Sequence, residues 1–463
     1  MEQRAENKMG VRPVGRLLVS MSLPIMLSML IQALYNIVDS IFVAQVSEKA
    51  LTAVSLAFPV QNLLIAVAIG TSVGVNSLLS RRLGEKRYDA ANSAAANGLI
   101  LAVISWAVFA VLGLTCTRVF FKMFTTDPEL IEMGTWYTRI CLVFSLGIFI
   151  DVTCERIMQA TGDTIRPMIV QMSGAITNII LDPIFIFGWF GLPAMGVIGA
   201  AIATVIGQFV SMALAIIFVR KNTEVKVKLR ACRLEKQTVK DIYAVGVPAI
   251  IMQSIGTVMT VGLNKIIIAF STTATAVFGI YFKLQSFVFM PIFGLNSGMI
   301  PILGYNYGAK KPERMVKTLK VGMVISVSIM VLGTIIFQLF PEKLLMMFNA
   351  SEEMLLIGKV ALPAISLCFL SAGISIVLGA TFQATGDGYL SMITSITRQI
   401  VFVLPSAWVL GRVVGLHGVW FSFVIAEVFS LIMTIFFFRW EYRKKIKPLM
   451  IAQPQPQTPY VAE

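Results

Sequence analysis

The sequence predicts an all-α integral membrane protein in which twelve transmembrane helices form two pseudo-symmetric six-helix bundles. Three observations support this fold class: a large apolar excess, long apolar stretches along the whole chain, and an internal duplication. Of the 463 residues, 57% are hydrophobic and 13% are charged, against roughly 25% charged residues in an average soluble domain. A disordered or fibrous protein is therefore excluded, and a soluble enzyme is disfavoured. At about 20 residues per span, the chain holds about a dozen membrane helices.

The apolar stretches recur at short intervals and give the expected helices in order. We place them at 17–46, 51–80, 93–121, 131–160, 167–189, 194–219, 239–270, 274–304, 318–340, 354–384, 389–411 and 415–438. Several of these stretches are longer than a membrane requires. Those helices are therefore expected to tilt, to kink, or to extend beyond the hydrocarbon.

The basic residues predict the orientation of these helices. The net charge is +14, and most of the Lys and Arg fall in groups on one side of a twelve-helix arrangement. These groups are Arg4 to Arg16, Arg81 to Arg87, 220–240, 310–320 and 439–447. By the positive-inside rule, both termini are cytoplasmic in a multi-pass protein of the cell (inner) membrane. The basic charge is thus a topology signal, and we expect no nucleic-acid partner.

The chain repeats itself at an offset of about 224 residues. The motif QATGD ends at Asp163 and again at Asp387, and Pro24 in SLPIML matches Pro248 in GVPAII. Further matched pairs are Gln61 and Gln285, Gly70 and Gly294, Gly74 and Gly298, Gly84 and Gly308, and, at an offset of 222, Pro183 and Pro405. The two prolines inside the first helix of each half are expected hinges.

Each half therefore contains six helices and enters and leaves the membrane on the same side. We expect an N-terminal lobe at 1–219, a cytoplasmic linker at 220–238, a C-terminal lobe at 239–442 and a cytoplasmic tail at 443–463. Such parallel repeats are related by an axis along the membrane normal, with a binding site between or within the halves. Two lobes that rock against each other indicate a transporter.

A polar face on the first helix singles out Asp39. Gln32, Tyr35, Asn36 and Asp39 are spaced so that they share one side of a helix whose other residues are mostly Leu, Ile and Val. An ionisable residue within a span is costly unless it serves a purpose. This polar face is therefore expected to contact protein or water, not lipid.

Asp182 lies in a similar setting on the fifth helix, where Gln171 and Asn178 share its face. Pro183 follows directly, which disfavours α geometry at Asp182 and frees the carbonyl of residue 179. A carboxylate beside free oxygens suits a hard cation such as Na⁺, whereas a carboxylate in an apolar setting suits proton exchange. Both possibilities stay open.

The duplication gives neither acid an acidic counterpart. Leu263 matches Asp39, and Ser406 or Leu404 matches Asp182, depending on the register. A scaffold requirement would be shared by both halves. An acid pair confined to the first half is typical of a coupling site.

Several stretches together resemble the multidrug and toxic compound extrusion (MATE) family of bacterial efflux transporters over essentially the whole chain. They are SLPIMLSMLIQALYNIVDSIFVAQV, SRRLGEK, QATGD, TNIILDPIFIFG, GAAIATVIGQ and the echoing second half. The resemblance implies a V-shaped pair of bundles and antiport, in which an amphipathic, cationic drug leaves while H⁺ or Na⁺ enters. It also implies a cation site at Asp39, Asn178, Asp182 and Thr204. Some relatives carry acids in helices 7 and 10, but these helices contain none here.

The substrate surface is expected where polar and adaptable apolar residues meet. The chain has 25 Met and 31 Phe, and Met and aromatic side chains suit organic cations. The candidate cavity residues are Gln32, Tyr35, Asn36, Gln61, Asn62, Glu155, Met252, Gln253, Gln285 and Met290. Glu155 could instead pair with neighbouring Arg156. The expected partners are small organic cations and the bilayer, with no cofactor, no metal apart from Na⁺, and a monomeric protein.

Two alternatives to a drug antiporter remain. A flippase for lipid-linked oligosaccharides, from the same broader superfamily, would more readily carry a basic central cavity, whereas this chain offers acids. An intramembrane aspartyl protease would use two buried Asp as a dyad. The YD and GxGD signatures of such proteases are missing, and a dyad would not explain the duplication. We therefore expect no enzyme.

Overall fold

The protein is a bundle of long helices joined by short connections. The computed structural model describes residues 6–227, 234–348 and 350–451. The first half contains α1 (Lys8–Val11), α2 (Val14–Val46), α3 (Glu48–Gly84), α4 (Tyr88–Thr115), α5 (Thr117–Phe124), α6 (Pro128–Val143), α7 (Leu146–Ala160), α8 (Ile165–Phe187), η1 (Trp189–Gly191) and α9 (Val197–Arg220). The second contains α10 (Lys236–Ile268), α11 (Thr272–Gly308), α12 (Pro312–Leu339), α13 (Pro341–Met346), α14 (Glu352–Ser366), α15 (Phe369–Thr385), α16 (Gly388–Ile396), η3 (Thr397–Val403), α17 (Leu404–Val413), α18 (Leu416–Glu441), η4 (Tyr442–Ile446) and α19 (Lys447–Ile451).

The predicted all-α membrane fold is confirmed. Among the described residues, eleven helical segments are long and apolar enough to cross a membrane. The remaining predicted span, 131–160, is divided into α6 and α7, each too short to cross alone. Helices α4 and α12 begin several residues before their predicted starts at 93 and 318. Their first turns carry Asp89 and Glu313, which favour a helix N-terminus but lie outside an apolar window.

Two interruptions repeat in the two halves and support the duplication. α6 gives way to α7 at Phe144–Ser145, and α14 gives way to α15 at Leu367–Cys368. The QATGD loops also repeat: Gly162 and Gly386 have φ values of +94° and +93°. Glycine adopts this left-handed region readily, so both loops end their helices in the expected way.

The C-terminal segment differs from the predicted tail at 443–463. Helical structure continues through η4 and α19 to Ile451, and residues 452–463 lie outside the described part. The cause is packing, because Ile446 is fully buried and Tyr442 and Met450 pack against the same apolar core. The chain therefore folds onto the bundle well beyond the last apolar run.

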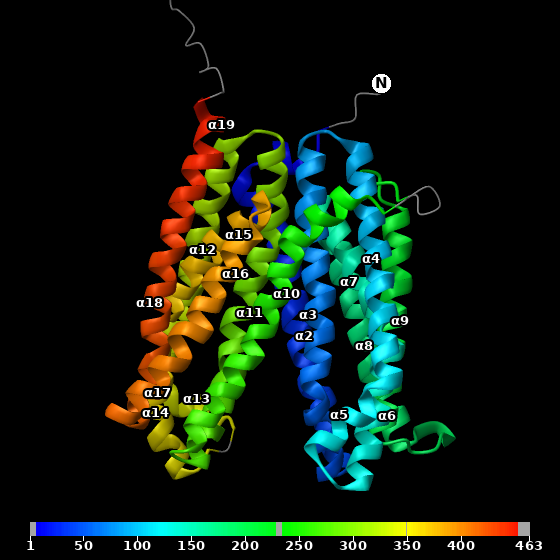
Figure 1. Cartoon of the computed structure of the whole chain (residues 1–463), viewed down its shortest axis with the longest axis vertical. Coiled ribbons are helices and arrows are strands. Elements are labelled where there is room, and N and C mark those ends of the chain that lie inside the picture. Colours follow the sequence, from blue (N-terminus) through cyan, green and yellow to red (C-terminus); the bar gives the residue numbers. More distant parts are fainter. Residues whose placement is uncertain (1–5, 228–233, 349, 452–463) are drawn as a thin grey trace, which may run out of the picture.

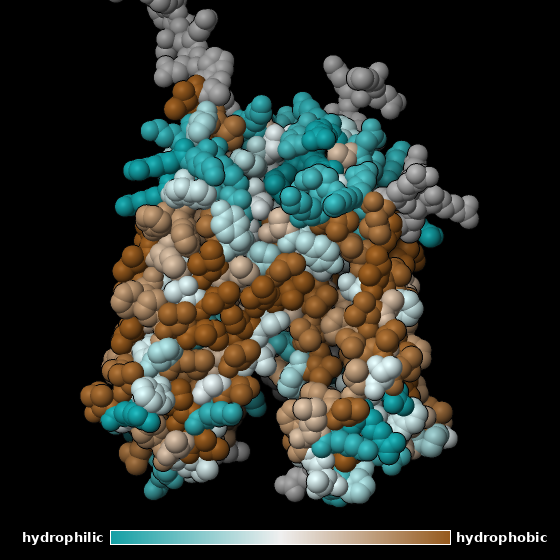
Figure 2. Space-filling view, in the orientation of Figure 1, coloured by the Kyte–Doolittle hydropathy of each residue, from teal (hydrophilic) through white to brown (hydrophobic). Residues whose placement is uncertain are grey.

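The two halves form separate legs that join at one end. Figure 1 shows the helices of the first half on one side and those of the second half on the other, with the first and last described segments at the top. Figure 2 shows a broad apolar belt between hydrophilic ends, and an open cleft between the two legs at the bottom. We call the end that holds the termini the closed end and the other the open end. The arrangement is the predicted V shape.

The apolar core follows this shape. At the closed end one core crosses between the lobes, joining Leu17 and Leu79 of the N-lobe to Leu303 and Met315 of the C-lobe. Toward the open end each lobe has its own core. Among the described residues, the core that the two lobes share therefore lies at the closed end.

Matched glycines let the lobes approach at the closed end. A Cβ atom on Gly74 of α3 would lie 2.1 Å from the carbonyl oxygen of Ile242, and one on Gly308 of α11 would lie 2.1 Å from that of Arg81. The other glycines of the repeat also face the opposite lobe; these are Gly70, Gly84, Gly294 and Gly298. Backbones meet this closely only where the side chain is absent.

A short N-terminal segment, Glu6–Arg12, bridges both lobes at the closed end; we call it the strap. The Asn7 side chain donates to the carbonyl oxygen of Thr161 in the N-lobe over 3.0 Å. On the C-lobe side, Asn306 donates to the carbonyl oxygen of Met9 over 3.1 Å, and Lys311 pairs with Glu6. Met9 is fully buried. The strap therefore holds the two lobes together.

Candidate functional site

Two helices of the N-lobe bring Asp39 and Asp182 together. Asp39 lies on α2 and Asp182 on α8, and the two helices pack side by side. The two carboxyl groups lie within reach of each other, and two carboxylates this close are stable only with a proton or a cation between them. Asp182 is fully buried, and Oδ1 of Asp39 is buried without a hydrogen-bond partner.

Asn178 and Thr204 complete the cluster. Asn178 lies one turn before Asp182 on α8, and Thr204 comes from the adjacent α9. With the Asn178 amide turned so that both neighbours are satisfied, its nitrogen donates to Oδ2 of Asp182 over 2.8 Å. Its oxygen then accepts from the Thr204 hydroxyl over 3.2 Å. The structure thus brings together all four residues that the sequence proposed for cation coupling.

Helix α8 continues without a break through Pro183 to Phe187, so the expected loss of α geometry at Asp182 does not occur. Pro183 still lacks an N–H group, which leaves the carbonyl of Ile179 without its usual donor. That carbonyl lies on the turn between Asn178 and Asp182. The turn therefore offers oxygen atoms of several kinds near the carboxyl pair.

The cluster has acids but no basic partner. None of the ion pairs found among the described residues involves Asp39 or Asp182. A buried carboxylate without a counter-charge is stabilised by binding a proton or a cation. The four residues therefore gather carboxylate, amide and hydroxyl oxygens, the ligand types that small hard cations prefer, around one point of the N-lobe.

Comparisons with known proteins support a transporter. The MatE family model matches residues 24–184 and again residues 248–409, which also reproduces the duplication. The chain belongs to the MatE family. Its members are transporters, not enzymes. The chain is 27% identical to the multidrug export protein MepA of Staphylococcus haemolyticus, over 91% of this chain and 93% of that protein. It is also 27% identical to the probable multidrug resistance protein NorM of Thermotoga maritima, over 94% and 95% of the two chains.

Solved structures agree with this fold. One, described as the outward-facing conformation of a multidrug resistance MATE family transporter, matches with a TM-score of 0.90 at 26% identity, over 97% of this chain and 100% of that one. Another is a transporter of the MOP superfamily from Pyrococcus furiosus, with a TM-score of 0.89 at 27% identity and the same coverage. This MatE chain therefore has the MATE fold over nearly its whole length.

The C-lobe of the MatE chain holds an ion pair in the region that matches the N-lobe cluster. Nη1 of Arg398, in the π-helical turn η3, lies 3.1 Å from Oε2 of Glu427 on α18. Glu427 directly follows Ala426, which the repeat aligns with Thr204. Arg398 thus places a permanent positive charge beside an acid of the C-lobe. Among the ion pairs of the described residues, no basic side chain pairs with Asp39 or Asp182 in the N-lobe.

The predicted cavity residues occupy different places. Asn62 of α3 donates to the Thr257 hydroxyl of α10 over 2.6 Å, across the boundary between the lobes. Gln61 points into the N-lobe, where it donates to Tyr137 over 3.2 Å and contacts Cys141, a neighbour of Asp39. Among the remaining candidates, Gln253 is exposed, whereas Gln32, Met252, Gln285 and Met290 are partly buried. The side chains of Tyr35 and Asn36 lie outside the described part.

Two features near these residues were not predicted. Tyr137 is buried and accepts the hydrogen bond from Gln61, and only its place in a predicted span hinted at it. Glu155, predicted to line the substrate cavity, lies in a separate pocket of the N-lobe with Arg156 and Gln159. The i, i+4 spacing of Asp151 and Glu155 shows a shared helix face, but it does not show which helices cover that face.

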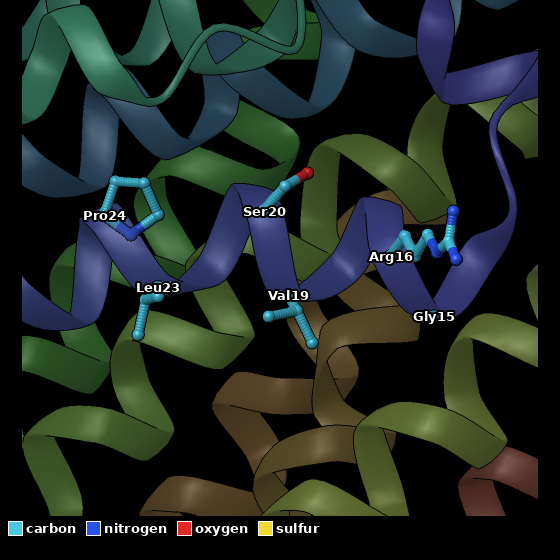
Figure 3. Close-up of a pocket in the computed structure, with 6 residues that line it drawn as sticks. All are labelled: Gly15, Arg16, Val19, Ser20, Leu23 and Pro24. Carbon is cyan, nitrogen blue, oxygen red and sulfur yellow. The ribbon is translucent and has the colours of Figure 1, made fainter.

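A larger groove, of about 420 Å³, runs along α2 near the closed end. Figure 3 shows its lining residues along one helix, from Gly15 and Arg16 to Pro24. Val19 and Leu23 are about half exposed within it. Arg16 and Ser20 are its polar lining residues and it contains no acid, so it offers no carboxylate to a coupling ion.

Proposed function

We propose that this MatE protein is a cation-coupled antiporter that exports amphipathic, cationic drugs by alternating access, with H⁺ or Na⁺ as the coupling ion. The observation that carries the proposal is the contact between Asp39 and Asp182, with Asn178 and Thr204 beside it and no basic partner. Such a pair changes its charge when it gains or loses one small cation. That change in charge couples the ion gradient to the position of the lobes.

The charge distribution supports an orientation. The largest clusters of described basic residues, at the end of α3, at the start of α12 and in η4, lie at the closed end, where Figure 2 shows a hydrophilic surface, whereas Lys49 and Arg412 lie toward the open end. Basic residues favour the cytoplasmic side. In the proposed orientation the termini are cytoplasmic, the cleft opens outward, and the structure is the state that releases drug and receives the coupling ion.

The names of the relatives support the substrate class. MepA and NorM are described as multidrug export and multidrug resistance proteins. In this chain, Asn62 bonds to Thr257 across the boundary between the lobes, and Met252, Gln253, Gln285 and Met290 lie on α10 and α11 of the facing lobe. A surface of amides and methionines adapts to varied organic cations. The proposed drug site is therefore the apex of the cleft, next to the acidic N-lobe.

Dye efflux from cells tests the proposal. We expect cells that express Asp39→Asn or Asp182→Asn to retain ethidium at the level of cells without the protein, with unchanged amounts of transporter in the membrane. The matched control is Asp89→Asn, because Asp89 is an exposed Asp at the start of α4. Full efflux by Asp39→Asn would refute the coupling role. In proteoliposomes, imposed Na⁺ or pH gradients identify the ion.

A further inference from the structure

A second polar pocket lies inside the N-lobe, between α2, α7 and α8. Its polar lining includes Ser28, Glu155, Arg156, Gln159 and Gln171, and its volume is about 40 Å³. A space of this size holds a few water molecules or one partly hydrated small cation. It is separate from the cleft and lies within a single lobe.

Glu155 is the most unusual residue in this pocket. Its side chain is almost fully buried, with 8% exposed, and Oε1 has no hydrogen-bond partner. Asp151 lies one turn earlier on α7, interacts electrostatically with Glu155, and also has a buried carboxyl oxygen without a partner. Buried carboxyl oxygens without partners are costly, so both point to an occupant that binds them.

The charges in the pocket leave room for one cation. Arg156 is the basic side chain that lines it, and its guanidinium donates to Oε1 of Gln159 over 2.9 Å. The ion pairs of the described residues do not join Arg156 to Glu155. The nearby Cys154 is an uncharged thiol with an apolar neighbourhood. Asp151 and Glu155 thus supply two carboxyl groups for one guanidinium, so the group can take up one small cation or a proton.

The pocket is in line with the cation cluster. On α8, Gln171, Asn178 and Asp182 share one face, and on α2, Ser28, Gln32 and Asp39 repeat the same type of spacing. At a rise of about 1.5 Å per residue, the pocket lies roughly 16 Å from the Asp39–Asp182 pair, toward the closed end. Polar residues of two packed helices therefore lie on the faces that run from one site toward the other.

We propose that Glu155, together with Asp151, forms a second station for the coupling cation. The ion would reach it from Asp39 and Asp182 along the polar faces of α2 and α8, and leave at the closed end. The ion would then cross within the N-lobe, while the drug crosses between the lobes. The repeat supports a special role, because Ser375 and Gly379 stand in the C-lobe at the positions of Asp151 and Glu155. The inference rests on the proposed function.

Purified protein and proteoliposomes test this station. For Glu155→Gln, we expect an ethidium dissociation constant within about twofold of wild type and at least a tenfold slower ion movement driven by an ethidium gradient. One arm follows ²²Na⁺ and the other follows H⁺ with an internal pH dye, so that the ion is identified. Glu132→Gln is the matched control, since Glu132 is an exposed Glu of the same lobe.

The conservative variant Glu155→Asp separates an ion ligand from a packing role. It keeps the carboxylate but changes the side-chain length, so we expect ion movement to recover in part, even if the Gln variant binds dye poorly. The proposed second cation site would be refuted if Glu155→Gln moved ions at the wild-type rate. It would also be refuted if Glu155→Asp moved ions no faster than Glu155→Gln. If Asp39→Asn also moved ions normally, the proposed antiport itself would fail. If ion movement were lost in Asp39→Asn but not in Glu155→Gln, only the second cation site would be refuted, and the proposed antiport would stand.

Discussion

At the scale of residues, the two lobes differ in the acids inside their helices. The N-lobe holds Asp39 and Asp182 without an ion-pair partner among the described residues, whereas Glu427 of the C-lobe is paired with Arg398. Asp39 and Asp182 contact each other, and Asn178 is held between Asp182 and Thr204. In the proposed cation site the Asn178 amide serves as a ligand and also as a positioning group for Asp182. Its loss should weaken ion binding without removing either carboxylate.

Asn178→Ala is expected to lower the affinity for the coupling ion. A hydrogen bond to a charged group contributes about 1.5–3 kcal/mol, which corresponds to roughly a tenfold or greater loss of affinity. The measurement is the ion concentration that gives half-maximal dye transport in proteoliposomes. Thr177→Ala is the control, because that hydroxyl bonds only to Ser173 within α8 among the contacts found. Equal values for both variants would contradict the role of Asn178.

The residues of the cation cluster were accessible from the sequence for a physical reason. Polar residues at helical spacing stand out on an apolar helix, and this pattern, with the family resemblance, singled out Asp39 and Asp182, which the structure brings together. Tyr137 and the pocket around Glu155 were not identified, because they depend on which helices pack against each other. The side-chain spacing on one helix carries no information on its neighbours.

At the scale of elements, apolar length predicted the spans but not their interruptions. The apolar runs continue through Phe144–Ser145 and Leu367–Cys368, where the helices break. In the eleventh span, Pro405 cannot donate to the preceding turn, and the helix widens into the π-helical turn η3 just before it. This widening lies next to Arg398, which pairs with Glu427 on α18.

Breaking this pair is expected to destabilise the C-lobe. Arg398→Met or Glu427→Gln leaves one charge unpaired, and we expect a loss of about 1–3 kcal/mol, since the partial exposure of Arg398 screens the charge. The double variant should recover most of this loss. Thermal unfolding of the purified protein measures the effect, and additive losses in the double variant would contradict the account.

The glycines of α3 are expected to control how closely the two lobes approach at the closed end. Gly74→Ala places a methyl group against the backbone of Ile242, so we expect the closed end to loosen and dye transport to fall several-fold. Gly279→Ala on α11 is the control, because a Cβ there has no heavy atom within 4 Å. Distances between spin labels at the open ends of α3 and α11 give the readout. An unchanged distance distribution in Gly74→Ala would contradict the role of the close approach.

At the scale of the whole molecule, two lobes share one core at the closed end and separate toward the open end. The sequence predicted this plan through the duplication and the parallel six-helix halves. It did not predict the strap, because Glu6–Arg12 is a polar segment with no periodic pattern. Its role comes from partners some 150 and 300 positions away in the chain.

Removal of the strap is expected to favour opening of the closed end. Deletion of residues 1–11 removes the contacts of Asn7 and Met9 with both lobes, so labels at the closed ends of α4 and α12 should show a larger population at long distances. Glu6→Gln removes only the charge of the pair with Lys311 and should have a smaller effect. Identical distributions in the deletion variant and the wild type would show that the strap does not hold the lobes.

The central claim is that the acid pair of the N-lobe couples an ion gradient to drug export. Its most direct test is ion-driven ethidium transport in proteoliposomes that contain wild type, Asp39→Asn, Asp182→Asn or Asp89→Asn. The account predicts transport by wild type and Asp89→Asn, and none by the two variants of the pair although they still bind ethidium. Gradient-driven transport by Asp39→Asn at the wild-type rate would contradict it.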